Sequence, residues 1–284
     1  MVRWIATWLA LALVGLAVAR LVIRPAQESW WLVSAGRDDA VLVAQYTVGN
    51  TGLFADQLTT RVLLLRPDGS PLAHRAIRGP ARLDGDGVHG ALDTLERTGD
   101  AWELRVEGDA MRVRARAEGL GTACPPAPGR LDGFLDIPDA SASSEGARLD
   151  GAAVLTHIRS TGTATLTTAL YAVDRDGSVV IDPLAACGGF LVLDGRGAAV
   201  RTAPLPYDLD ERLDLELAGH RVVITPGRRQ WTEPAFDGAF GAEALLARAV
   251  GYHEPTVTFQ RVRVEVDGRT PWAGVLVVRD GRGG

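Results

Sequence analysis

The sequence predicts an all-β protein that follows one N-terminal apolar helix. From Ser29 onward, short runs rich in Val, Leu and Thr are separated by Gly, Asp and Pro at about ten-residue spacing, as in antiparallel sheets. In the run Met111–Ala117, apolar residues alternate with arginines, which is typical of a strand with one buried and one solvated face. Only Ala239–Val250 has the pattern of a further helix. We therefore expect a chain built almost entirely of strands and hairpins.

Residues 1–25 are expected to be a signal peptide or a membrane anchor. The apolar run Trp4–Ala19 ends in Ala17-Val18-Ala19, the small-x-small pattern that signal peptidase cleaves. The run resumes after Arg20, so an uncleaved helix of roughly 20 residues that spans the bilayer is a second interpretation, and a buried helix is a third. The first two interpretations both export the rest of the chain. We therefore expect a periplasmic protein, or a membrane-anchored one that faces the periplasm.

A first β domain is expected over residues 26–120. Ala40–Val48 alternates in part and closes at a Gly49-Asn50-Thr51-Gly52 turn, and Leu58–Leu65 ends at Arg66-Pro67-Asp68-Gly69. Ala101–Val106 and Met111–Ala117 flank another turn, which predicts a half-buried antiparallel hairpin. Each strand of this domain is thus followed by a recognisable turn.

A linker is expected over residues 121–146 and a second β domain over residues 147–284. The linker segment is rich in Gly, Pro, Ala and Ser, a composition that suits a connector better than a central strand. The second domain ends in a hairpin, in which Val257–Val266 and Trp272–Val278 flank an Asp267-Gly268 turn.

An internal repeat links the two domains. Leu58–Ser70 (LTTRVLLLRPDGS) and Leu166–Ser178 (LTTALYAVDRDGS) share Leu-Thr-Thr at the start and Asp-Gly-Ser at the end, without a gap. The repeat indicates either the duplication of one β domain or two hairpins that arrived independently at the same turn chemistry.

Together these features resemble the two-domain lipocalin-like family that includes carotenoid hydratase (hydroxyneurosporene synthase) and the bacterial AttH-type proteins. The residues that carry the resemblance are Glu28-Ser29-Trp30-Trp31, the Gly49-Asn50-Thr51-Gly52 turn and the repeated hairpin. The likeness covers roughly Ser29–Asp280 and contains no diagnostic catalytic signature. It implies two tandem lipocalin-like antiparallel β-barrels, or barrel-like sandwiches, with the ligand in an apolar cavity or at the domain interface. It also implies a role in envelope lipid or lipoprotein handling, because some exported members accompany ABC transporters with large-ectodomain permeases.

Composition excludes several classes of function. The net charge of −5 argues against nucleic-acid binding, which requires a basic face. All thirty basic residues are arginine, which removes Schiff-base lysines and the P-loop lysine from consideration. The five histidines show no metal-ligand spacing, and no Gly-x-Ser-x-Gly elbow occurs. We therefore expect neither a metal nor a cofactor.

The candidate catalytic residues are His157, His253 and Glu254. His157 interrupts the apolar run Val154–Ile158, where it either lines a barrel or is a hydrogen-bonded core residue. In Tyr252-His253-Glu254, an extended backbone would put Tyr252 and Glu254 on one face and His253 on the other, whereas a turn would leave all three solvated. With an extended backbone, the face that lines a cavity could transfer a proton to a ligand, whereas the turn would give these residues no such role.

The candidate ligand-binding residues are mostly aromatic residues in or beside expected strands. Inward aromatic side chains of a barrel either line a pocket or plug the interior. Trp30 and Trp31 must point to opposite faces, so at most one of them lines a given cavity. The expected set is Trp31, Tyr46, Asn50, His157, Tyr171, Trp231, Tyr252 and His253.

The two cysteines, Cys124 and Cys187, are expected to form a disulfide in an exported chain, with two buried thiols as the alternative. Such a bond would tie the linker to the second domain.

Three functions are consistent with these patterns. The first is binding of a lipidic or other apolar ligand by an exported envelope protein that serves an ABC transporter. The second is a hydratase or cyclase that acts on an isoprenoid-type substrate in the same cavity. The third is a purely structural β-sandwich interaction module. We rank binding first, because it requires only apolar walls and one or two polar groups, whereas turnover requires a positioned proton donor.

Overall fold

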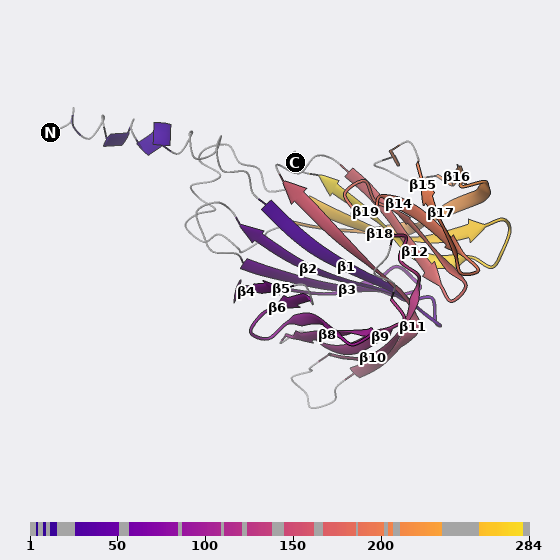
Figure 1. Ribbon diagram of the computed structural model, residues 1–284, viewed down its shortest axis with the longest axis horizontal. Coiled ribbons are helices and arrows are strands. Elements are labelled where there is room, and N and C mark those ends of the chain that lie inside the picture. Colours follow the sequence, from indigo (N-terminus) through magenta and orange to yellow (C-terminus); the bar gives the residue numbers. More distant parts are fainter. Residues whose placement is uncertain are drawn as a thin grey trace.

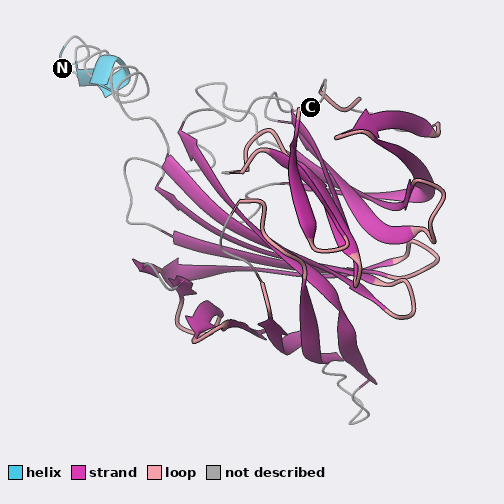
Figure 2. Cartoon of the chain, turned by 45° about the vertical axis from the view of Figure 1, so that its right-hand side comes forward, coloured by secondary structure: helices cyan, strands magenta, loops and turns pink. Residues whose placement is uncertain are grey.

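The computed structural model describes residues 4, 8–9, 12–15, 26–50, 57–84, 87–108, 111–120, 124–137, 145–161, 167–185, 187–201, 204–206, 211–234 and 256–280. Beyond a short N-terminal helical segment, the regular elements are strands (Figures 1 and 2). No helix in the described part of the chain is long and apolar enough to cross a membrane. The expected helix Ala239–Val250 lies outside the described residues.

The first sheet, which we call the first barrel, has eleven antiparallel strands in the order β4-β3-β2-β1-β11-β10-β9-β8-β7-β6-β5. Its strands are β1 (Ala26–Gly36), β2 (Val41–Asn50), β3 (Gln57–Leu65), β4 (Pro71–Pro80), β5 (Arg82–Asp84), β6 (Gly87–His89), β7 (Thr94–Thr98), β8 (Ala101–Glu107), β9 (Arg112–Glu118), β10 (Gly129–Ile137) and β11 (Glu145–Thr161).

The second sheet, which we call the second barrel, has eight antiparallel strands in the order β15-β14-β13-β12-β19-β18-β17-β16. Its strands are β12 (Thr167–Asp174), β13 (Gly177–Ile181), β14 (Gly189–Leu193), β15 (Arg196–Val200), β16 (Leu213–Leu217), β17 (His220–Pro234), β18 (Thr256–Val266) and β19 (Trp272–Asp280). In each sheet two runs of sequence neighbours, β1–β4 and β5–β11 or β12–β15 and β16–β19, are joined where the first strand pairs with the last, and the strands at the two edges are β4 and β5 or β15 and β16. One sheet forms a half-barrel and the other a nearly closed barrel, so the expected all-β tandem lipocalin-like architecture is confirmed.

Three hydrophobic cores follow from this layout, one inside each barrel and one between the barrels. Strand β1 shows how the sequence produces them. Its alternate side chains, among them Trp30 and Leu32, fill the first barrel, while Trp31 and Val33 pack against the second barrel. Strand β12 is likewise buried on both faces. This double burial explains why β1 and β12 read as continuous apolar runs rather than as alternating strands. Figure 1 shows the resulting stack, in which β1 and β11 lie against β12 and β19.

The expected linker is wrong, because β10 and the start of β11 fall within residues 121–146 and belong to the first barrel. The first barrel therefore extends to Thr161, and the second begins at Thr167. The glycines that suggested a connector serve packing instead. A side chain at Gly133 would run into the backbone of Arg114 and Ala115 on the neighbouring strand.

The internal repeat does not align equivalent strands of the two barrels. It matches β3, the third strand of the first barrel, with β12, the first strand of the second. Both segments are strands that end in a tight turn, so the shared residues reflect hairpin chemistry at two different places in the fold. The two sheets have a similar strand order, but this repeat does not reflect it.

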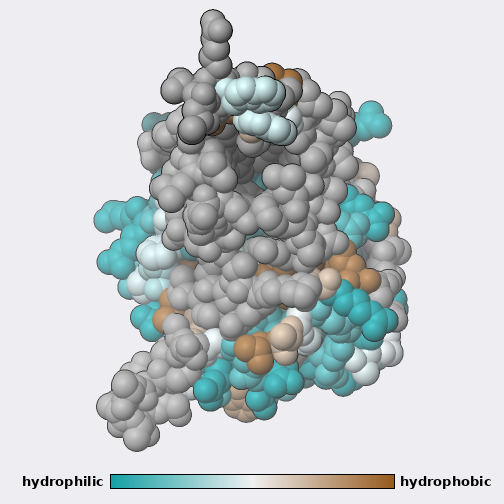
Figure 3. Space-filling model, turned by 90° about the vertical axis from the view of Figure 1, so that its left-hand side faces the viewer, coloured by the Kyte–Doolittle hydropathy of each residue, from teal (hydrophilic) through white to brown (hydrophobic). Residues whose placement is uncertain are grey.

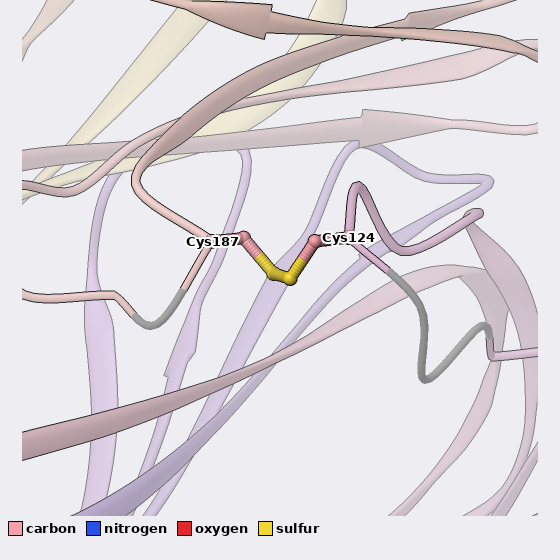
Figure 4. Close-up of a disulfide and its surroundings, with 2 residues drawn as sticks. All are labelled: Cys124 and Cys187. Atoms are coloured by element: carbon pink, nitrogen blue, oxygen red, sulfur yellow. A yellow bond between two sulfur atoms is a disulfide. The ribbon is translucent and has the colours of Figure 1, made fainter.

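Cys124 and Cys187 form a disulfide with a Cα–Cα distance of 5.4 Å (Figure 4). Cys124 lies between β9 and β10 of the first barrel, and Cys187 lies just before β14 of the second. Beside it, Pro125 packs so closely on Gly197 of β15 that a Cβ at Gly197 would overlap the proline ring. The disulfide thus joins the two barrels at one edge of their interface.

Candidate functional site

Four inward-facing side chains form a row near one end of the first barrel, and we call them the mouth row: His157, Trp30, Tyr46 and Thr60. They lie on β11, β1, β2 and β3, and each is paired directly with the next across the sheet. Residues opposite one another in adjacent strands point to the same face, so all four point toward the core of the first barrel. This is the end at which β1 begins and β11 ends. Figure 3 shows this side of the molecule, with hydrophilic residues along its flanks.

The mouth row has two titratable side chains, His157 and Tyr46, and of these only His157 is partly exposed. The exposed fraction of its side chain is 29%. Its ring stacks on Trp30 with the ring centroids 4.4 Å apart. Its Nε2 lies 3.9 Å from Oε2 of Glu28, and this nitrogen is buried without a hydrogen-bond partner among the described residues. Burial lowers the pKa of His157 and outweighs the opposing influence of the Glu28 carboxylate. The imidazole is therefore neutral at neutral pH.

Glu28 is held by an ion pair rather than left as a lone carboxylate. Its Oε1 lies 2.6 Å from Nε of Arg159, whose side chain is 72% exposed. Glu28 and Arg159 are directly paired across β1 and β11, one row nearer the strand ends than Trp30 and His157. The polar rim beside the mouth row thus carries one negative and one positive charge.

Tyr46 closes the first barrel at the level of the mouth row. The side chain is fully buried, and its hydroxyl donates a hydrogen bond to the carbonyl oxygen of Arg105 on β8, at 3.0 Å. Burial raises the pKa of Tyr46, and the nearby carboxylate of Asp93 raises it further. Tyr46 therefore plugs the interior. A ligand that enters from this end would lie on the solvent side of the row.

Two of the expected aromatic residues meet at the interface between the barrels instead. Trp31 stacks on Tyr171, with centroids 6.0 Å apart and planes within 5°, and the guanidinium of Arg279 lies 4.7 Å from the Trp31 ring centroid. Both aromatic side chains are at most 2% exposed. They belong to the packed core between the barrels.

A buried charge network surrounds that pair. Arg279 donates to both carboxylate oxygens of Asp182, at 2.8 and 3.1 Å, and to the Tyr171 hydroxyl at 3.2 Å. The Tyr171 hydroxyl donates a further hydrogen bond to Asp182. Burial alone would raise the pKa of Asp182, but Arg279 and the hydrogen bonds lower it below its ordinary value. Asp182 is therefore ionised at neutral pH and cannot serve as a proton donor. Burial raises the pKa of Tyr171, so its phenol stays protonated.

A second polar cluster links the two barrels away from the disulfide. Arg61 of β3 is 3% exposed and forms an ion pair with Glu233 of β17. Trp231 of the expected set lies two residues away and donates from Nε1 to Glu233 at 3.3 Å. Its side chain is among the exposed large hydrophobic groups at 36%. Trp231 is the one predicted aromatic residue in this cluster that a ligand could reach without rearrangement.

The remaining predicted residues are not placed. Tyr252, His253 and Glu254 lie outside the described residues, and for Asn50 the structure gives the strand position but no side chain. Sequence reasoning missed Asp182, Arg279, Arg61 and Glu233 as partners. Nothing in the local sequence marks them, because each finds its partner only after the strands assemble.

A separate cavity of about 180 Å³ lies at the opposite end of the first barrel. Its lining includes Ser34, Leu42, Leu64 and Leu149, with Arg37, Asp38, Arg148 and Asp150 around it. It contains none of the predicted site residues.

No protein-family model and no curated protein matches the sequence of this chain. Among solved structures, a protein from Nitrosomonas europaea assigned as AttH matches with a TM-score of 0.57 and 13% identity, over 91% of this chain and 93% of that chain. Kievitone hydratase from Nectria haematococca matches with a TM-score of 0.51 and 10% identity, over 90% of this chain and 89% of that chain. At these identities the likeness concerns the fold. The expected resemblance is thereby confirmed at that level: this chain has the two-domain lipocalin-like fold of the AttH and hydratase type.

Proposed function

We propose that this protein is an exported envelope protein that binds the apolar part of a lipidic ligand at the mouth of the first barrel. The observation that carries the proposal is His157, which is stacked on Trp30 with a buried nitrogen that lacks a described partner. Leaving such a group unpaired costs about 1–3 kcal/mol. A core that needed only packing would do better with an apolar side chain at this position, whereas a binding site uses a polar group to orient its ligand.

The interface between the barrels is a weaker candidate for the ligand site. It is filled by apolar side chains, and it is held by the disulfide and, away from the disulfide, by Arg61 and Glu233. Opening it would expose the buried charges of Asp182 and Arg279. The mouth row belongs to the first barrel, so a ligand there would not require the two barrels to separate.

The test of ligand binding is native mass spectrometry of the protein purified from its own envelope. We expect a co-purifying lipid with the wild type and its loss in Trp30→Ala. Trp272→Ala, in the core of the second barrel, controls for general loss of packing. A wild-type protein that carries no lipid, and that binds none from added envelope lipids, would favour the structural-module function.

A hydratase is the second candidate, and two observations favour it: the fold is shared with kievitone hydratase, and His157 lies beside Glu28. A neutral imidazole next to a carboxylate can accept a proton and pass it on. The test incubates the purified protein with linear isoprenoids and looks for hydrated or cyclised products. Product that disappears in His157→Ala would establish turnover, and binding without product would support the binding function.

Export and the transporter partner complete the proposal. Cleavage after Ala19 should give a mature protein that begins at Arg20, and a retained anchor should give the full-length chain in the membrane fraction. Unprocessed protein in the cytosol would contradict export. Service to an ABC transporter predicts that a permease with a large ectodomain is cross-linked to the protein in intact envelopes.

A further inference from the structure

The charges around the mouth row restrict the head group that a ligand can bring there. Glu28 lies 3.9 Å from Nε2 of His157, and Arg159 lies 2.6 Å from Glu28. An anionic head group beside His157 would face the Glu28 carboxylate at close range, and a cationic one would compete with Arg159 for Glu28. Glu28 is only 29% exposed and is already paired with Arg159, so a charged head group beside it would lose hydration and would gain only a carboxylate that it shares. The geometry therefore disfavours a charged head group of either sign.

The hydrogen-bonding capacity of His157 restricts the head group further. In a neutral imidazole, one nitrogen donates and the other accepts, and the tautomer depends on the partners of both. A hydroxyl group can donate to Nε2 in one tautomer and accept from it in the other. A carboxylate can only accept, and an ammonium group can only donate. An alcohol is thus the simplest head group that pairs with Nε2 in either tautomer.

We propose that the mouth row binds a long-chain alcohol, with its hydroxyl on His157 and its chain along Trp30. This inference rests on the proposed function and names the ligand class of that same site. The stacked Trp30 ring offers an apolar surface directly beside the nitrogen that the hydroxyl would reach.

The test measures binding of three ligands with the same chain, decanol, decanoate and decylamine, by isothermal titration calorimetry with the full chain. We expect decanol to bind at least about tenfold more tightly than either charged ligand, which corresponds to about one hydrogen bond. His157→Phe retains an aromatic ring on Trp30 and should remove that preference. His220→Phe is the matched control, because His220 also lies beside a carboxylate, 2.6 Å from Asp267, but in the second barrel.

The outcomes separate the two proposals. Equal binding of all three ligands, or tighter binding of decanoate, would overturn the alcohol inference and leave apolar binding in place. Binding of none of the three would overturn both. If His157→Phe fails to fold, the ¹⁵N shifts of the His157 ring in the wild-type protein decide the matter. They should move on addition of decanol and not on addition of decanoate, and a ring that does not respond to decanol would refute the contact.

Discussion

Replacing Asp182 by Asn tests whether the buried charge network holds the two barrels together. The substitution keeps the shape of the side chain and removes the only carboxylate that Arg279 contacts among its described hydrogen bonds. Asp182 has a fully buried side chain, and that of Arg279 is 12% exposed, so the guanidinium would stay in the interface without a counter-ion. Breaking a buried pair in this way costs about 3–5 kcal/mol of unfolding free energy. At a urea m value of about 3 kcal/mol per M, the midpoint should fall by about 1–2 M.

The assay is urea unfolding followed by tryptophan fluorescence, with Asp214→Asn as the matched control. Asp214 is bound by Arg221 in a similar double contact, but both side chains are largely exposed, so we expect little change. The double variant Asp182→Asn/Arg279→Met should recover part of the loss, because no charge is left buried. Since the pKa of Asp182 is lowered by folding, its contribution is complete at neutral pH and is lost as the pH falls through that lowered pKa. A loss in Asp182→Asn no larger than that in Asp214→Asn would refute the reasoning.

Three further predictions concern the disulfide, its neighbour and the mouth row. Cys124→Ser/Cys187→Ser removes a disulfide between residues 63 apart in sequence and should lower the free energy of unfolding by about 4 kcal/mol in the chain-entropy model. The measurement compares the urea midpoint of the variant with that of the wild type, with and without reductant. Equal midpoints would contradict the prediction. Gly197→Ala should lower the free energy of unfolding by about 1–3 kcal/mol, because the new methyl group would overlap the Pro125 ring. An unchanged melting temperature would show that the structure accommodates the methyl group without cost. Because folding lowers the pKa of His157, the unfolded chain binds a proton at this residue at a higher pH than the folded chain does. The free energy of unfolding should therefore fall as the pH drops from about 7.5 to about 5. His157→Gln should flatten that fall relative to His220→Gln, and identical pH profiles would exclude the effect.

The strands and turns were predictable where one face of the sheet meets water. The hairpin of β8 and β9 is an example, because buried Val113 and Ala115 alternate with exposed Arg114 and Arg116. The opposite directions of Trp30 and Trp31 were also predictable, since they follow from the two-residue period of a strand. Both predictions depend only on neighbouring residues.

The contents of the candidate site were predictable only in part. The sequence left open whether Tyr46 lines or plugs a barrel and whether His157 lines a barrel or is a core residue. The carbonyl oxygen that accepts from the Tyr46 hydroxyl belongs to Arg105, far along the chain. Arg61 and Glu233 come from different barrels. Their pairing depends on how two sheets stack, and no local pattern encodes that stacking. β10 was missed for a related reason, because Gly133 reads as a linker residue until the neighbouring backbone is in place.

The pairing of first and last strands in each sheet has a consequence for how the chain folds. β1 and β11, like β12 and β19, are separated in sequence by all the other strands of their barrel. Contacts of such long sequence separation must overcome the entropy of closing a large loop, so we expect assembly in milliseconds to seconds or slower, with unpaired strand edges exposed in the meantime. β19 matters most in this respect, because it is the central strand that joins β12 to β18 and it also carries Arg279. Loss of this one strand would leave the second sheet in two unconnected pieces and the Asp182 carboxylate without its guanidinium.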